Sequence, residues 1–420
     1  MAFVRRDGRL LKKAASLRPY ALYYSTQFKP PITFSHFSIY KSTKFRYNSH
    51  RTIPEKERRR NMEIRNRNEH GVVWHNPNSF FRYNGWPSVC KDDEGTLYAV
   101  CSGFRVSHIC PFGKTVLFKS WDEGKTWSIP MVINDTWLDD RDAGIICLGG
   151  KTVLVTWFAH PVSVYTSKYE KAIRDSWGGS GGVLDMYSTI PESEGMGGSF
   201  VRVSHDGGMT WDPTVKLPVS TPHGPILMKD GSILYLGKEH YSYGAEKEHI
   251  ISTWESRDEG KTWQKLGELD IPEGTKWDNF HEPHAVELDD GRILGIIRAQ
   301  GAEVAFGFTM YQTYSDDGGK TWSEWVPMNI CGSPPHLLKH SSGAVVLVYG
   351  RRAEPFGERA VVTRDGGKTW SDEIVICETT PCDLGYPASV ELYDGSILTV
   401  YYQQFEKEGF PSVLSTRWKL

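Results

Sequence analysis

Short apolar runs recur along this chain, and the positions that separate them are polar and rich in glycine. Five of these runs lead into the same phrase, Ser/Thr-x-Asp-x-Gly-x-Thr-Trp, whose copies begin at Ser120, Ser204, Ser256, Ser315 and Thr363. The aspartate of such a phrase accepts backbone N–H bonds across a tight turn, and the glycine supplies a positive φ angle. Each copy therefore predicts a β-hairpin. Its aspartate is expected to form the turn, not to act in catalysis or to bind calcium.

A second hairpin pattern, of the form Asp-Gly-x-Ile-Leu, precedes each of these phrases and occurs once more near the end of the sequence. Its copies contain Gly95, Gly150, Gly231, Gly291, Gly343 and Gly395. Together the two patterns describe a unit of four strands that repeats about every 50 residues, which is typical of propeller blades. We therefore predict an all-β fold, a six-bladed β-propeller of four-stranded antiparallel blades. The sixth unit lacks a fourth strand, and we expect the segment GVVWHN near Val72 to supply it, because an open ring leaves exposed strand edges.

Charge divides the chain into two parts. The formal net charge is −2 over 420 residues, yet residues 1–61 contain 15 Lys/Arg and only 3 Asp/Glu. We predict a basic, disordered leader over residues 1–61, or a true first residue at Met62, and the propeller over residues 62–420. A transit peptide and a nucleic-acid-binding segment are the alternatives for the leader.

Composition narrows the choice of compartment and cofactor. No run of about 18 or more apolar residues occurs, so we expect no transmembrane helix. The seven cysteines are irregularly spaced, and no secretory signal is evident. We therefore expect a cytoplasmic protein with reduced thiols, no metal, no cofactor and no nucleic-acid partner. The oligomeric state stays open.

The first strand of each blade lines the central channel of a propeller, so the residues that begin these six strands crowd around one mouth. These positions are dense in titratable side chains, which is typical of an active site. They include Arg82, Asp139, Asp140, Arg141, Asp142, His223, Asp278, His281, Glu282, His284, His336, Asp383 and Tyr386. Arg298, Arg351 and Arg352 end second strands, and Arg359 begins a third strand. Several arginines at one mouth suggest a carboxylate ligand, because a guanidinium binds it bidentately.

The five aspartate phrases on a six-unit all-β chain resemble the Asp-boxes of the sialidase (neuraminidase) superfamily. The phrase HEPHAVEL places Glu282 where sialidases have the glutamate that polarises the nucleophile, and GYPASVEL places Tyr386 where they have the nucleophilic tyrosine. The same resemblance assigns Arg298 and Arg359 to the arginines that bind the substrate carboxylate. Two positions depart from the family: Gly85 stands where an arginine is expected, and AVCSGFRVSH lacks the acid/base aspartate. Arg82 is the candidate for the first role, and Asp142, Asp140 or a channel histidine for the second.

The resemblance implies an exo-glycosidase that hydrolyses a terminal carboxylated sugar. Tyr386 is then the nucleophile, Glu282 its partner, and Asp142 or Asp140 the acid, although the neighbouring Arg141 is expected to lower the pKa of that acid. Substrate contacts are expected from Arg82, Arg141, Arg298, Arg359, His223, His284 and His336. Two alternatives remain. One is a lyase or hydrolase of uronic-type glycans that uses channel histidines as acid and base. The other is a propeller that binds glycans without catalysis.

Overall fold

The computed structural model describes residues 68–176, 182–239, 249–379, 383–404 and 409–420. All of these lie in the compact unit that spans Pro54–Leu420. The predicted leader over residues 1–61 lies outside the described residues, as does its boundary at residue 62, and both stay predictions.

Six four-stranded antiparallel sheets make up this unit, which confirms the predicted all-β propeller. The first blade contains β2 (Tyr83–Lys91), β3 (Leu97–Arg105), β4 (Lys114–Ser120) and β5 (Met131–Asn134). The second contains β6 (Arg141–Gly149), β7 (Thr152–Ala159), β8 (Gly198–Ser204) and β9 (Val215–Leu217). The third contains β10 (Ile226–Leu227), β11 (Ile233–Lys238), β12 (Ile251–Ser256) and β13 (Gln264–Glu268).

The remaining blades repeat this order. The fourth contains β14 (Phe280–Glu287), β15 (Ile293–Gln300), β16 (Phe308–Ser315) and β17 (Val326–Pro327). The fifth contains β18 (Pro335–Lys339), β19 (Val345–Arg351), β20 (Gly357–Thr363) and β21 (Ile374–Val375). The sixth contains β22 (Gly385–Glu391), β23 (Ile397–Gln404), β24 (Pro411–Trp418) and β1 (Glu69–Trp74).

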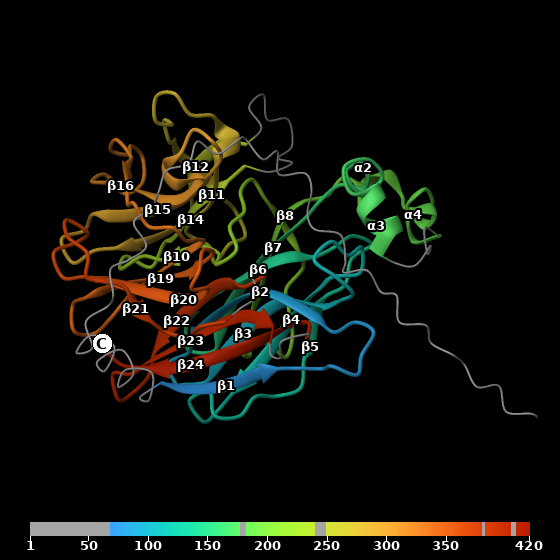
Figure 1. Ribbon diagram of the computed structural model, residues 1–420, viewed down its shortest axis with the longest axis horizontal. Helices are drawn as coiled ribbons and strands as arrows, with labels where there is room; N and C mark the ends of the chain where they lie inside the picture. The colour runs from blue at the N-terminus through green and yellow to red at the C-terminus, as the bar shows by residue number, and fades with distance from the viewer. Residues whose placement is uncertain (1–67, 177–181, 240–248, 380–382, 405–408) are drawn as a thin grey trace, which may run out of the picture. The chain divides into compact units, whose positions relative to one another are not determined.

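Strand β1 closes the ring, as the sequence predicted. It pairs antiparallel with β24, so the blue start of the described chain lies beside its red end in Figure 1. The first strands of the blades are innermost, and β2 contacts both β6 and β22. Residues at the starts of these six strands are therefore brought together although they lie far apart in the sequence.

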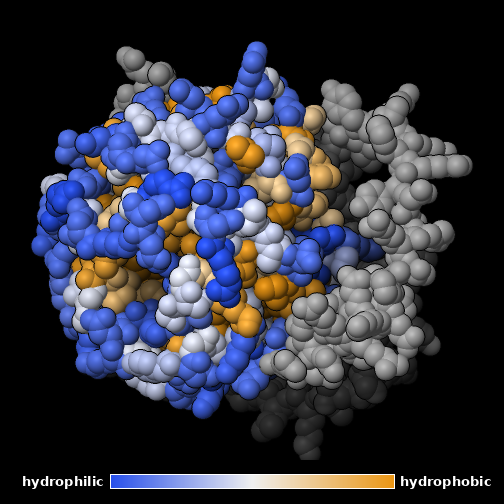
Figure 2. All heavy atoms as spheres, turned by 90° about the vertical axis from the view of Figure 1, so that its left-hand side faces the viewer, coloured by the Kyte–Doolittle hydropathy of each residue, from blue (hydrophilic) through white to orange (hydrophobic). Residues whose placement is uncertain are grey.

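The core lies between the blades. An apolar cluster fills each of the six blade boundaries, for example Leu234 and Leu236 of β11 against Ile293 and Ile297 of β15. On the face shown in Figure 2, hydrophilic residues form most of the surface and hydrophobic residues occur in smaller groups between them.

The five aspartate phrases connect the third and fourth strands of the first five blades, and their aspartates form the turns as predicted. In each, Oδ1 accepts the backbone N–H of the threonine four residues later at 2.8–2.9 Å, and Oδ2 accepts that threonine's hydroxyl at 2.6–2.7 Å. The tryptophans that end the phrases each pack against the cluster between their own blade and the preceding one. They are Trp127, Trp211, Trp263, Trp322 and Trp370.

A helical insertion between β7 and β8 was not predicted from the sequence. It contains α2 (Val162–Tyr165), α3 (Glu170–Ser176), α4 (Gly182–Tyr187) and α5 (Glu192–Gly195), and Figure 1 shows it as the green group beside the second blade. Tyr165, Ile173, Leu184 and Tyr187 form its own apolar cluster. Two short 3-10 helices, η1 (Trp277–Asn279) and η2 (Ala305–Gly307), occur in the fourth blade. None of the helices in the described ranges combines the length and hydrophobicity needed to span a bilayer.

Candidate active site

Four of the innermost strands begin with the same backbone irregularity. Trp86, Asp142, Glu282 and Tyr386 have φ angles of 54°, 51°, 47° and 52°, and each lies where the pairing with the second strand shifts register. The left-handed conformation costs a non-glycine residue on the order of 1–3 kcal/mol, and such positions cluster at active sites. Bulges of this kind re-aim side chains at the end of a strand.

Tyr386, Glu282 and Arg298 meet in one hydrogen-bonded group. The Tyr386 hydroxyl donates to Glu282 Oε1 at 2.6 Å. Arg298 Nη1 donates to Glu282 Oε2 and, at 3.1 Å, to the Tyr386 oxygen. These three residues come from β22, β14 and β15, and they are the central residues of the predicted site.

The charges in this group favour a neutral phenol beside an ionised carboxylate. Burial, and then the charge of Glu282, raise the pKa of Tyr386 well above its usual range. Burial also raises the pKa of Glu282, but the Arg298 charge and the hydrogen bonds from Tyr386 and Arg298 outweigh it, so that pKa is lowered. Glu282 is therefore ready to accept the phenolic proton.

The second arginine beside Tyr386 is Arg352 and not the predicted Arg359. The Arg352 guanidinium lies 5.7 Å from the centroid of the Tyr386 ring, and its buried Nε and Nη2 have no hydrogen-bond partner. Arg359 instead donates to three backbone oxygens, those of Glu358, Cys377 and Pro355, at 2.7–3.0 Å. The sequence contains Arg352 in the phrase LVYGRR, but pattern alone does not say which arginine faces Tyr386.

Arg82 also lies apart from the central group. Its guanidinium stacks 3.9 Å over the Phe410 ring and donates to the Pro77 oxygen at 3.3 Å. The left-handed position of the first blade is occupied by Trp86, which is almost fully buried. The guanidinium carbons of Arg105 and Arg141 lie 4.6 Å and 4.2 Å from its ring.

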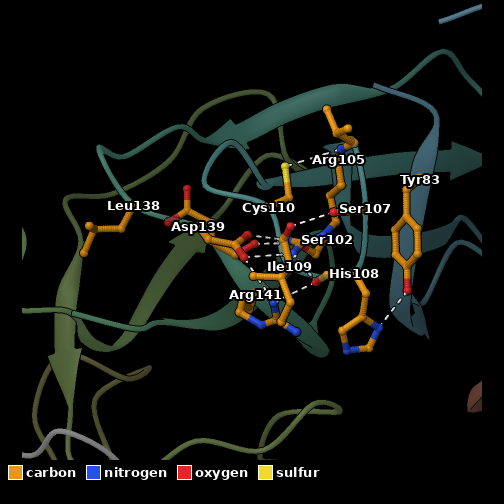
Figure 3. Close-up of polar contacts among 12 residues, drawn as sticks. Tyr83, Ser102, Arg105, Ser107, His108, Ile109, Cys110, Leu138, Asp139 and Arg141 are labelled. Carbon is orange, nitrogen blue, oxygen red and sulfur yellow. Dashed lines mark hydrogen bonds and ion pairs between the residues drawn. The ribbon is translucent and has the colours of Figure 1, made fainter. Parts of the chain in front are cut away.

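Asp139 holds these two arginines in place (Figure 3). Arg105 donates to both carboxylate oxygens of Asp139, and Arg141 donates to Oδ2 at 3.1 Å. Arg141 also donates to the backbone oxygen of His108 at 3.1 Å. Arg141 is thus bound to Asp139 and to the 105–110 loop, a role that the sequence did not predict.

The two aspartates predicted as acid differ in position. Asp140 accepts the backbone N–H and the hydroxyl of Thr136 at 3.1 Å and 2.8 Å, as a buried loop residue. Asp142 has a buried Oδ1 without a hydrogen-bond partner. Burial raises the pKa of Asp142 to about 7, Arg141 opposes that rise, and the charge of Glu282 adds to it. The expected lowering by Arg141 therefore occurs but is outweighed by burial.

Three of the predicted histidines form a cluster next to Tyr386, in which His284 and His336 are stacked and His223 meets both rings edge to face. The ring centroids of His223, His284 and His336 lie 4.6–5.8 Å from one another, and His223 lies 6.4 Å from Tyr386. Burial lowers the pKa of all three, that of His284 to about 3, so they are neutral. His281 instead contacts Lys238 and the Asp278 oxygen. Among the described residues, no group of His, Cys, Asp and Glu has the arrangement of a metal site.

The loop after β3 contributes a histidine that the sequence patterns did not single out. His108 Nδ1 lies 3.0 Å from the Tyr83 hydroxyl, which donates to Asp383 Oδ2 at 3.0 Å. Tyr402 donates to the other Asp383 oxygen at 2.9 Å. His108 ends the phrase AVCSGFRVSH, where the resemblance expects the acid/base aspartate, and that position is the sequence signal that could have identified it.

The propeller fold agrees with what comparisons with known proteins find. A family model described as a BNR repeat-like domain matches residues 165–399. No curated protein matches the sequence. A protein of unknown function from Dyadobacter fermentans is 23% identical with a TM-score of 0.65, over 83% of this chain and 97% of that one. An intramolecular trans-sialidase from Ruminococcus gnavus is 15% identical with a TM-score of 0.57, over 83% and 97%. A sialidase from Trypanosoma rangeli is 16% identical with a TM-score of 0.53, over 83% and 57%. At these identities the likeness concerns the fold.

Proposed function

This chain belongs to the BNR repeat-like domain family, and on that premise we propose that it is a retaining exo-glycosidase that hydrolyses a terminal carboxylated sugar. The observation that carries the proposal is the hydrogen-bonded group of Tyr386, Glu282 and Arg298. A phenol with a pKa near 10 is a weak nucleophile at neutral pH, and an ionised carboxylate in contact with it can remove its proton as it attacks.

A tyrosine nucleophile suits an anionic sugar. A carboxylate nucleophile would repel the substrate's own carboxylate, whereas a neutral phenol develops negative charge only as its proton passes to Glu282. The transition state of glycoside cleavage resembles an oxocarbenium ion, and a tyrosine nucleophile is one of the known exceptions to the usual pair of carboxylates. Arg298, next to the phenol oxygen, stabilises the charge that develops there.

Arg352 supplies the binding site for the substrate carboxylate in this proposal. A buried guanidinium with unpartnered Nε and Nη2 lacks the hydrogen bonds that a buried charge requires. A carboxylate placed between Arg352 and Arg298 would satisfy those donors bidentately. The Trypanosoma rangeli structure contains sialic acid, and the Ruminococcus gnavus structure contains oseltamivir carboxylate, so carboxylated ligands are bound on this fold.

The first blade provides no further arginine for the carboxylate. Gly85 stands where sialidases have one, and Arg82 stacks on Phe410 instead, so fewer charges bind the carboxylate. The proposed substrate class therefore includes uronic acids as well as sialic acid. Of the two aspartates predicted as the acid, Asp142 remains the candidate, because the Asp140 carboxylate already accepts two hydrogen bonds from Thr136.

The test is turnover by the Tyr386→Phe variant. The purified protein is screened against 4-methylumbelliferyl glycosides of N-acetylneuraminic, glucuronic and galacturonic acids, and NMR identifies the anomer released by the wild type. We expect retention of configuration, and a loss of at least about 10³-fold in kcat for the Phe variant with little change in melting temperature. Tyr401→Phe is the matched control, since Tyr401 bonds to Thr416 away from the site.

Three outcomes contradict the proposal in different ways. A fully active Tyr386→Phe variant removes the nucleophile assignment. An unsaturated sugar product favours the lyase that uses channel histidines. Binding on a glycan array without release of any sugar favours the non-catalytic propeller.

A further inference from the structure

His108, Tyr83 and Asp383 form a group with a defined proton arrangement, and Figure 3 shows the contact between Tyr83 and His108. The Tyr83 hydroxyl donates its hydrogen to Asp383 Oδ2 at 3.0 Å, so the Tyr83 oxygen is the acceptor for His108 Nδ1, 3.0 Å away. Asp383 Oδ1 lies 3.7 Å from the same nitrogen. These contacts keep a proton on Nδ1 and leave Nε2 as the atom that gains or loses one. An imidazole held in one tautomer in this way is arranged for acid and base chemistry.

His108 also differs from the other proton carriers of the site in its exposure. Its side chain is 46% exposed, whereas Asp142 and Tyr386 are 7% and 5% exposed as residues. A leaving group departs toward solvent, so the group that protonates it must lie on the solvent side of the nucleophile. Trp86 connects the two regions, since its ring centroid lies 5.0 Å from that of His108 and 6.4 Å from that of Tyr386.

Asp142 is less suited to this role, because it is almost fully buried. The charge of Glu282 raises its pKa, and Asp142 in turn raises the pKa of Tyr386, so its electrostatic neighbours are the nucleophile and its base. In a retaining mechanism the nucleophile and the acid flank the scissile bond from different sides. A buried carboxyl beside the nucleophile is poorly placed to protonate a departing sugar.

Resting on the function proposed above, we propose that His108 is the general acid and base of this enzyme and that Asp383 and Tyr83 position it. In the first step Tyr386 bonds to the anomeric carbon and its proton passes to Glu282. The glycosidic C–O bond breaks, and His108 Nε2 gives its proton to the leaving oxygen. In the second step neutral His108 takes a proton from water as the water oxygen bonds to the anomeric carbon. The bond to Tyr386 then breaks, and Glu282 returns the proton to the phenolate.

The experiment compares substrates with different leaving groups. His108→Ala is assayed on the 4-nitrophenyl glycoside and the methyl glycoside of whichever of the three acid sugars the wild type cleaves. We expect kcat/KM to fall by about 10²–10⁴-fold on the methyl glycoside, which needs protonation, and by less than about 10-fold on the 4-nitrophenyl glycoside. Added azide should restore turnover of the 4-nitrophenyl substrate as the glycosyl azide, because azide attacks without a base.

Tyr386→Phe and Asp142→Asn separate a failure of the His108 assignment from a failure of the proposed glycosidase function. Tyr386→Phe should lose both substrates equally, and wild-type protein that cleaves none of the glycosides would overturn both proposals together. With an active wild type, equal losses on both substrates in His108→Ala overturn the role of His108 alone. If Asp142→Asn loses much more activity on the methyl glycoside than on the 4-nitrophenyl glycoside, and His108→Ala does not, the general acid is Asp142.

The positioning role of Asp383 is tested by the pH dependence of kcat/KM, which a purely structural role of this residue would leave unchanged. Partial burial lowers the pKa of His108, Asp383 opposes this, and Arg141 and Arg105 add to the lowering. Activity requires protonated His108, so kcat/KM on the methyl glycoside falls as pH rises through that pKa. Asp383→Asn removes the opposing carboxylate, and we expect the fall at lower pH than in the wild type. An unmoved profile contradicts the positioning role.

Discussion

Glu358 is a buried carboxyl group beside the site that has no hydrogen-bond partner on either oxygen. Burial raises its pKa to about 8, although Arg352 and Arg359 oppose the rise. Glu358 is therefore mainly protonated at neutral pH and does not cancel the charge of Arg352. This leaves the Arg352 guanidinium fully charged toward an anionic ligand, which agrees with its unpartnered Nε and Nη2.

Glu358→Gln should remove a pH dependence of stability. The pKa of about 8 in the folded protein is above the ordinary value of 4.5, so the folded state binds this proton more tightly than the unfolded state. Wild-type stability should fall as pH rises from about 4.5 to about 8, by on the order of 3 kcal/mol by neutral pH from this group. Urea unfolding at about pH 5 and about pH 7.5 measures the difference between wild type and variant.

The control for this measurement is Glu324→Gln, which changes an exposed carboxylate in the fourth blade. We expect its pH dependence to match that of the wild type, whereas that of Glu358→Gln should be flatter. If the free energy of unfolding changes equally between the two pH values in all three proteins, Glu358 is ionised in the folded state.

The Asp-box hairpins show how a local element builds the ring. Each box fixes its turn through its own side chains and places a tryptophan against the preceding blade. In the fourth blade, the almost fully buried Ser315 hydroxyl donates to Asp317 Oδ1 at 2.9 Å and accepts the Gly319 N–H at 2.8 Å. The first residue of the phrase thus helps the aspartate to fix the turn.

Ser315→Ala should lower the free energy of unfolding by about 1–3 kcal/mol, because the buried Gly319 N–H loses its acceptor. Chemical unfolding measures this loss, and Ser163→Ala, at an exposed position in α2, is the control. We expect activity to be retained below the unfolding transition, since the box lies away from the Tyr386 group. An unchanged midpoint for Ser315→Ala would mean that water replaces the hydroxyl at no cost.

The whole fold could be predicted because its determinants are local and repeated. The hairpin residues form their turns within eight positions of sequence, and six copies in series imply a ring that must be closed. The helical insertion escaped prediction because α2 to α5 are short and occur only once, so no repeat marks them.

The site could be predicted only in part, for a different physical reason. Tyr386, Glu282 and Arg298 lie in phrases with a known resemblance, and the structure brings them into contact. Which of Arg352 and Arg359 faces Tyr386 depends on which side of a strand each occupies. The protonation of Asp142 depends on burial, and the place of His108 depends on a loop from another blade. These quantities are properties of the folded ring and are not carried by any short segment.

Ring closure by β1 makes a prediction about the entire molecule. Val73 belongs to the apolar cluster between the sixth and first blades, and Asn68 Nδ2 donates to the Val375 and Ile376 oxygens at 3.2 Å and 3.0 Å. A protein that starts at residue 75 loses these contacts and exposes the edge of β24, which invites association. We expect it to aggregate or to melt without a cooperative transition, while a protein that starts at residue 62 melts like the full chain. Thermal unfolding and size-exclusion chromatography compare the three proteins. A cooperative, monomeric protein that starts at residue 75 with an unchanged melting temperature would mean that five complete blades and a three-stranded sixth are stable without closure.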